Sequence, residues 1–171
     1  MNKLLISAGA VAALAFTAAP AAAAPVSANA NAQAKIYRPL SIQNNNGLDF
    51  GTLVLSGTAP YSTVVSVSQA GALTYDNSYV TPSGTAQAAS FTVKGTSNQN
   101  VNITLPASTV SLTGSNGGTL TLTIDAPTTA AIGSAGPTTG VTFGVGGSLT
   151  LTDTTTDGVY TGSFAVNADY Q

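Results

Sequence analysis

A chain of 171 residues is long enough for one domain, and only 6% of its residues are charged, against about 25% in an average soluble protein. The sequence contains no His, Cys, Trp or Glu, which excludes a Ser-His-Asp triad, a thiol nucleophile and a zinc site with the usual nitrogen and sulfur ligands. Four basic residues are too few for a phosphate-binding surface, so we expect no enzyme, no metal or other cofactor and no nucleic-acid partner.

Residues 1–23 have the pattern of a secretory signal peptide. Lys3 supplies the positive charge, Leu4 to Phe16 is an apolar run, and Ala21-Ala22-Ala23 is a small-residue cleavage motif. The run is shorter than the roughly 20 apolar residues that a membrane-spanning helix needs, and no later stretch is long and apolar enough to span. We therefore expect cleavage after Ala23, export through the periplasm and no transmembrane segment in the mature chain.

Residues 24–36 form an N-terminal extension in which apolar and polar residues alternate without a break from Val26 onward. Drawn as a strand, Val26 to Ile36 would be about 36 Å long at roughly 3.3 Å per residue. One hypothesis is a donor strand that pairs with another molecule by β-augmentation, and the other is a low-complexity Ala/Asn linker. The apolar face of the candidate donor strand consists of Val26, Ala28, Ala30, Ala32, Ala34 and Ile36.

Residues 37–171 are predicted to form one all-β domain. Apolar residues recur at every second position, as in Leu120, Leu122 and Ile124, and the residues between them are threonines. Turn signals separate these stretches, and many short strands with regular turns are typical of a β-sandwich or barrel. The turn signals lie at residues 44–47, 82–84, 114–118, 146–147 and 157–158.

The scarcity of charge also bears on the strand edges. Lys, Pro and bulges normally protect an exposed edge from pairing with other chains, and this sequence has few charges for that purpose. Two interpretations stay open: the edges pair with another chain, or neutral polar side chains are protection enough.

Three smaller groups could carry chemistry. The stretch Asp153–Asp157 could suggest a calcium loop, but it lacks the ligand density of one and favours a turn. Lys94 could form an isopeptide bond with an Asn, although an exposed strand lysine is the simpler interpretation. Tyr61, Tyr75 and Tyr79 could form a sugar-stacking patch, and pairing within the core or across strands is the alternative.

A further strand is expected between Gly158 and Gln171, with the even positions on one face. An ordinary strand of a sandwich and an edge that accepts a second chain both fit this pattern. The even positions are Tyr160, Gly162, Phe164, Val166, Ala168 and Tyr170.

The two ends and the strand pattern resemble a pilus subunit of the chaperone–usher pathway, nearest to the cysteine-poor archaic relatives and the spore-coat protein U group. In such pilins a glycine lies fourteenth from the C-terminus and an aromatic residue second. Gly158 and Tyr170 occupy those positions when Gln171 is counted as the first. The chain is also similar to an uncharacterised family of exported bacterial β-proteins. The segments that carry this second similarity are Leu48-Asp49-Phe50-Gly51-Thr52, Ala88-Ala89-Ser90-Phe91-Thr92-Val93 with Gly95-Thr96, and Gly158-Val159-Tyr160-Thr161-Gly162-Ser163-Phe164.

The resemblance implies an immunoglobulin-like β-sandwich that lacks its last strand and is a subunit of a cell-surface fibre for adhesion and biofilm. A periplasmic chaperone would fill the gap temporarily, with basic residues holding the carboxylate of Gln171. At an outer-membrane usher, the extension of the next copy would replace the chaperone. On this resemblance the acceptor and chaperone-binding residues are Gly158, Tyr160, Phe164, Val166, Ala168, Tyr170 and Gln171.

One feature departs from the resemblance, because donor strands usually present larger side chains than four successive alanines. Each buried CH₂ group contributes about 0.8 kcal/mol, so an alanine face stabilises less than Val or Ile would. Either the groove is shallow, or the contact uses mainly Val26 and Ile36, or the extension is a linker. The alternative functions are a monomeric secreted β-sandwich that binds carbohydrate or another surface ligand, and a coat component that packs without strand exchange.

Overall fold

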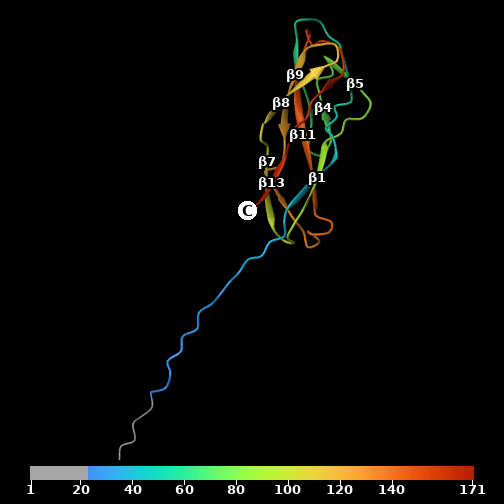
Figure 1. Cartoon of the computed structure of the whole chain (residues 1–171). Helices are drawn as coiled ribbons and strands as arrows, with labels where there is room; N and C mark the ends of the chain where they lie inside the picture. Colours follow the sequence, from blue (N-terminus) through green and yellow to red (C-terminus); the bar gives the residue numbers. More distant parts are fainter. Residues whose placement is uncertain (1–22) are drawn as a thin grey trace, which may run out of the picture. The chain divides into compact units, whose positions relative to one another are not determined.

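The computed structural model describes residues 23–171, so the predicted signal peptide lies outside the described residues except for Ala23 (Figure 1). Residues 23–40 contain no helix or strand, and 23–39 are exposed. Ile36–Gln171 forms a compact unit of its own. Between residues 23 and 171 there is no helix, and hence none that is long and apolar enough to cross a membrane.

The domain is all-β, as the sequence predicted, and its architecture is consistent with a β-sandwich. Every paired strand runs antiparallel to its neighbour. The strands are β1 (Ser41–Asn46), β2 (Thr52–Leu55), β3 (Ser62–Val67), β4 (Leu73–Thr74), β5 (Val80–Ser83), β6 (Ala89–Lys94), β7 (Asn100–Thr104), β8 (Thr109–Gly114), β9 (Thr119–Asp125), β10 (Thr129–Ala131), β11 (Val141–Thr152), β12 (Tyr160–Thr161) and β13 (Asn167–Tyr170).

The main sheet has the strand order β1-β6-β11-β9-β8-β12, and β3 and β4 are added to it through β11. A three-stranded sheet has the order β10-β7-β13, and β2 pairs with β5. β7 and β8 follow each other closely in the chain and pair with β13 and β12, in registers that include Thr104 with Asn167 and Gly114 with Tyr160. The single strand expected between Gly158 and Gln171 is thus interrupted: β12 and β13 pair with different neighbours, and residues 162–166 between them are not in a strand.

The long strand β11 connects three other strands of the main sheet. Its first part pairs with β6, and its second part pairs with β3 and β9. The prediction of a turn at residues 146–147 was wrong, because both glycines lie inside β11. A Cβ atom added to Gly146 would collide with the carbonyl oxygen of Val67, and one added to Gly144 with that of Gln69. These glycines serve close packing and do not form a turn, because the absence of a Cβ atom lets the neighbouring backbone approach β11.

The predicted turn at residues 44–47 was wrong in its first three positions, because Asn44 to Asn46 belong to β1. Their side chains support the strand: Asn45 Nδ2 donates to Thr92 Oγ1 at 2.9 Å, and Asn44 Nδ2 donates to the carbonyl oxygen of Asn46 at 2.9 Å. The register of the β1–β6 pair shifts between Asn44 and Asn46. Asparagine side chains thus stabilise a local irregularity in a strand, although asparagine is more common in turns.

The core follows the predicted alternation. Leu122 and Ile124 of β9 are buried, while the threonines between and beside them are exposed. Phe91 stacks on Phe143 of the neighbouring strand β11, with ring centroids 5.9 Å apart. The largest fully buried side chains are Val65, Val67, Val80, Val93, Val101, Ile132 and Val145.

Candidate functional site

The segment from Tyr160 to Tyr170 presents alternating side chains to the core, as the sequence predicted. Val166 is buried, and Tyr160, Phe164, Ala168 and Tyr170 are partly buried, whereas the odd-numbered residues between them are exposed. Gly162 is exposed, but an added Cβ atom would lie only 2.7 Å from Leu112 Cδ2. The even positions therefore share one face, which lies against the domain.

The backbone of this segment is paired on one side only. β12 pairs with β8 and β13 pairs with β7, and neither strand has a second neighbour among residues 23–171. Between them, residues 162–166 make no backbone–backbone hydrogen bond to any described residue. A free edge therefore extends from Tyr160 to Tyr170, with unpaired peptide groups in its middle.

The other end of the main sheet is also open. Among residues 23–171, β1 pairs only with β6, and all six of its residues are exposed, including Ile42. Five successive antiparallel pairings lead from β1 through β6, β11, β9 and β8 to β12. β1 and β12 consequently run in opposite directions. The sequence did not single out β1 as an edge, because strand order cannot be read from alternation.

Tyr170 connects β13 to the segment that precedes β1 and to the segment that follows β6. Its hydroxyl donates to the carbonyl oxygen of Arg38, three residues before the start of β1, at 2.7 Å, and it accepts from the Thr96 amide at 2.7 Å. The ring stacks on Tyr37 with centroids 4.8 Å apart. Gly95 leaves room for this contact, since an added Cβ atom would lie 2.5 Å from the Tyr170 hydroxyl. Tyr170 thus holds the free edge beside the segment that leads into β1.

Phe164 contacts the domain in the middle of the edge. Its ring lies against that of Phe91 on β6, with centroids 6.2 Å apart and planes tilted by 57°. Because β6 is the neighbour of β1, Phe164 packs against the strand next to the other open end. The residues on either side, Ser163 and Ala165, are exposed.

The remaining predicted acceptor residues lie at the two ends of this segment. Gly158 has a φ of 144°, a conformation that favours glycine, and an added Cβ atom would lie 2.9 Å from Ser115 Oγ. Gln171 Nε2 donates to Asn102 Oδ1 at 2.8 Å, which extends the contact of β13 with β7.

The candidate donor strand is not part of a sheet in the described chain. From Val26 to Ile36 it has neither helix nor strand, and every residue is exposed. Val26 is 100% exposed and Ile36 is 87% exposed, the two highest values among the large apolar side chains. An extended apolar face without a partner is compatible with both the donor and the linker hypotheses.

The tyrosine group and the calcium-loop pattern have structural contacts in the described chain. Tyr61 stacks on Tyr79 at 5.0 Å, as the core-pairing interpretation predicted, whereas Tyr75 is exposed. Thr152 N donates to Thr155 Oγ1 at 2.9 Å within the turn that follows β11, where the calcium-loop pattern lies. Residues 23–171 contain no group of three or more acidic residues that could hold a metal ion.

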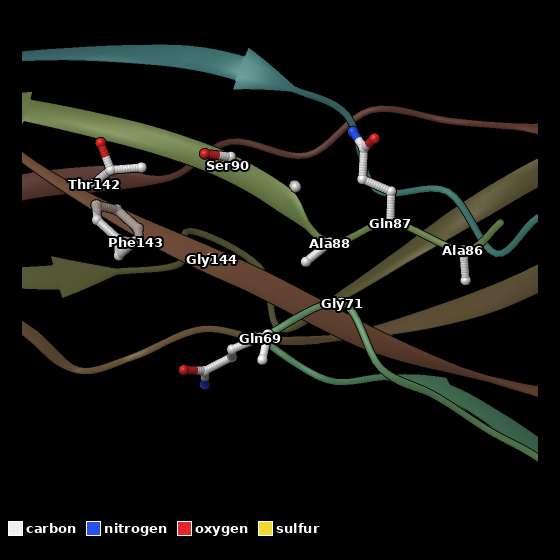
Figure 2. A pocket seen from close by; sticks show the side chains of 11 residues that line it. Gln69, Gly71, Ala86, Gln87, Ala88, Ser90, Thr142, Phe143 and Gly144 are labelled. Carbon is white, nitrogen blue, oxygen red and sulfur yellow. The ribbon is translucent and has the colours of Figure 1, made fainter.

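A shallow hollow of about 370 Å³ lies beside the point where β11 passes from β6 to β3 (Figure 2). Its walls are residues 69–71, 86–90 and 142–144, and the side chains are small or neutral. The side chain of Gln69 is fixed by a hydrogen bond from Nε2 to Asp125 Oδ1 at 3.1 Å. The polar side chains of the lining are those of Gln69, Gln87, Ser90 and Thr142, and the lining contains no charged group.

Residues 40–170 match the family described as a domain of unknown function, DUF4402. The chain belongs to this family. No curated protein and no solved structure matches the chain. The DUF4402 domain contains all thirteen strands, both open ends of the main sheet and Tyr170. The extension at residues 24–36 precedes it, so the candidate acceptor edge is part of the DUF4402 domain and the candidate donor strand is outside it.

Proposed function

We propose that the protein is a structural subunit of a cell-surface fibre, assembled by donor-strand exchange. In this proposal the extension of one copy, Val26–Ile36, pairs with the open edge, Tyr160–Tyr170, of the next copy. The observation that carries the proposal is this edge, whose even-numbered side chains face the core while the backbone of residues 162–166 makes no hydrogen bond to the described chain.

Physical chemistry favours the addition of a strand at this position. Backbone N–H and C=O groups in folded proteins are almost always paired, and an open edge readily adds a strand from another chain. A strand placed between the edge and β1 would supply partners for both ends of the main sheet. It would also cover Ile42 and Phe164, which are incompletely buried. The result would be a completed immunoglobulin-like sandwich.

The same edge needs protection before assembly. A free copy in the periplasm would expose its edge to unspecific pairing. A periplasmic chaperone that binds the Gly158–Gln171 segment would prevent this, and an outer-membrane usher would then exchange the chaperone for the extension of another copy. The proposed partners are therefore this chaperone, this usher and further copies of the chain, and the proposed role in adhesion and biofilm belongs to the fibre.

The proposal is tested by deleting residues 25–35, which lie outside both the compact unit and the DUF4402 domain. The shortened protein should fold but form no fibres in electron micrographs of the cell surface. When it is mixed with the intact protein, it should shorten the fibres, because it accepts an extension and offers none. Fibre formation by the shortened protein alone would contradict the proposal. If the intact protein stays a soluble monomer, this result would favour the alternative of a secreted binding module.

A further inference from the structure

We infer that the extension inserts in one register, antiparallel to the edge, with Val26 opposite Tyr170 and Ile36 opposite Tyr160. This inference rests on the proposed function and adds to it which residues face each other. The facing pairs on the inner side are then Val26 with Tyr170, Ala28 with Ala168, Ala30 with Val166, Ala32 with Phe164, Ala34 with Gly162, and Ile36 with Tyr160.

The direction follows from the topology. Because β1 and β12 run in opposite directions, a strand between them is antiparallel to one and parallel to the other. The edge from Tyr160 to Tyr170 is longer than β1, Ser41–Asn46. Antiparallel pairing is slightly more stable per residue than parallel pairing, so the more stable insertion is antiparallel to the longer edge.

The side-chain pattern excludes odd shifts of the register. The even positions of both segments carry their apolar faces, and a shift by one residue would turn Asn29 and Asn31 toward the core. Only shifts by two residues keep alanines on the inner side.

The ends of the two segments then select one register among the even shifts. Pro25 has no N–H group and cannot donate to the sheet, and Tyr37 is stacked on Tyr170 of its own copy. The extension can therefore pair over residues 26–36, which equals the length of the edge, residues 160–170. A shift by two residues leaves part of the edge unpaired and brings Pro25 or Tyr37 onto it.

This register also accounts for the two central alanines. Ala30 and Ala32 lie opposite Val166 and Phe164, where the edge contributes its bulkiest side chains between the two tyrosines. The larger Val26 and Ile36 lie at the two ends, opposite the rings of Tyr170 and Tyr160. Small donor residues therefore lie opposite large acceptor residues in the middle of the contact.

Paired cysteines test the register directly, because the native chain contains no cysteine. Directly opposite residues of an antiparallel pair have Cα atoms about 4.5–5.5 Å apart, which suits a disulfide, whereas diagonal neighbours are about 7–8 Å apart. The full-length double variant Asn29→Cys/Asn167→Cys should give a ladder of covalent multimers on a non-reducing denaturing gel. Each single variant should give dimers at most.

Three matched variants keep Asn29→Cys and move the second cysteine. Cross-linked multimers with Ala165→Cys or Asp169→Cys in place of Asn167→Cys would overturn the register. Multimers with Ser163→Cys would show parallel insertion or an antiparallel register shifted by four residues, and either result would overturn the register. In all three cases the fibres persist and the proposed function stands. If the wild-type chain forms no fibres and every double-cysteine variant stays monomeric, both the register and the proposed function would be overturned.

Discussion

The extension and the C-terminal edge carry the same alternating pattern, yet they differ in the folded chain. From Val26 to Ile36 every residue is exposed, whereas from Tyr160 to Tyr170 the even positions lie against the domain. The edge has a neighbour on one side, β7 and β8, and the extension has none. Alternation therefore indicates which side chains can share a face, and a neighbouring strand decides whether that face is buried. In the proposed fibre, each segment supplies the neighbour that the other lacks.

The largest effect is expected from a charge on the inner face of the extension. Ala30→Asp should lower the fraction of protein in fibres at least tenfold, because burying an unpaired carboxylate costs several kcal/mol. Asn31→Asp places the same charge on the outer face of the same segment and should leave assembly unchanged. Sedimentation of fibres measures both. Equal assembly of the two variants would mean that the extension is a linker and that the two regions do not pair.

A smaller effect is expected in the middle of the edge. Phe164→Ala removes the ring that packs on Phe91 and should lower the free energy of unfolding by about 2 kcal/mol, less than for a fully buried phenylalanine. The exposed neighbour substitution Ala165→Ser should change the free energy of unfolding little. Urea unfolding of the variant without residues 25–35 measures folding separately from assembly. If Phe164→Ala and Ala165→Ser change the free energy of unfolding equally, Phe164 does not stabilise the domain. The edge would then not differ from the extension in its packing.

The smallest effect is expected at the end of the edge. Tyr170→Phe removes the hydroxyl that bonds Arg38 and Thr96, and it should lower the free energy of unfolding by about 1 kcal/mol. Tyr75→Phe is the matched control, because Tyr75 is exposed. The same urea titration compares them. If both substitutions have the same effect, the Tyr170 hydroxyl does not stabilise the contact of β13 with Arg38 and Thr96.

The sequence predicts side-chain direction well in this protein. The alternation in β9 and in the C-terminal segment identified which residues face the core, because the two-residue period of a strand depends only on local geometry. The turns were less predictable. Gly146 and Gly147 lie within β11, where the neighbouring backbone requires residues without a Cβ atom, and that requirement arises from contacts distant in sequence.

The candidate site was predictable in part for the same reason. The sequence marked Tyr170 and the even positions of the edge, but it could not show that the hydroxyl binds Arg38, which lies 132 residues away in the chain. It also could not show that β1 is the opposite open end of the sheet, because the strand order depends on long-range pairing.

Amide hydrogen exchange at residues 162–166 tests the central claim most directly. The account predicts fast exchange in the variant without residues 25–35 and strong protection of the Gly162, Phe164 and Val166 amides in fibres of the intact chain. An inserted strand pairs only alternate amides, and the amides of the odd-numbered residues of this segment face β8 and β7. The amides of β9, which are paired in the domain itself, should be protected in both samples. Equal exchange at residues 162–166 in the two samples would contradict the addition of a strand at this edge.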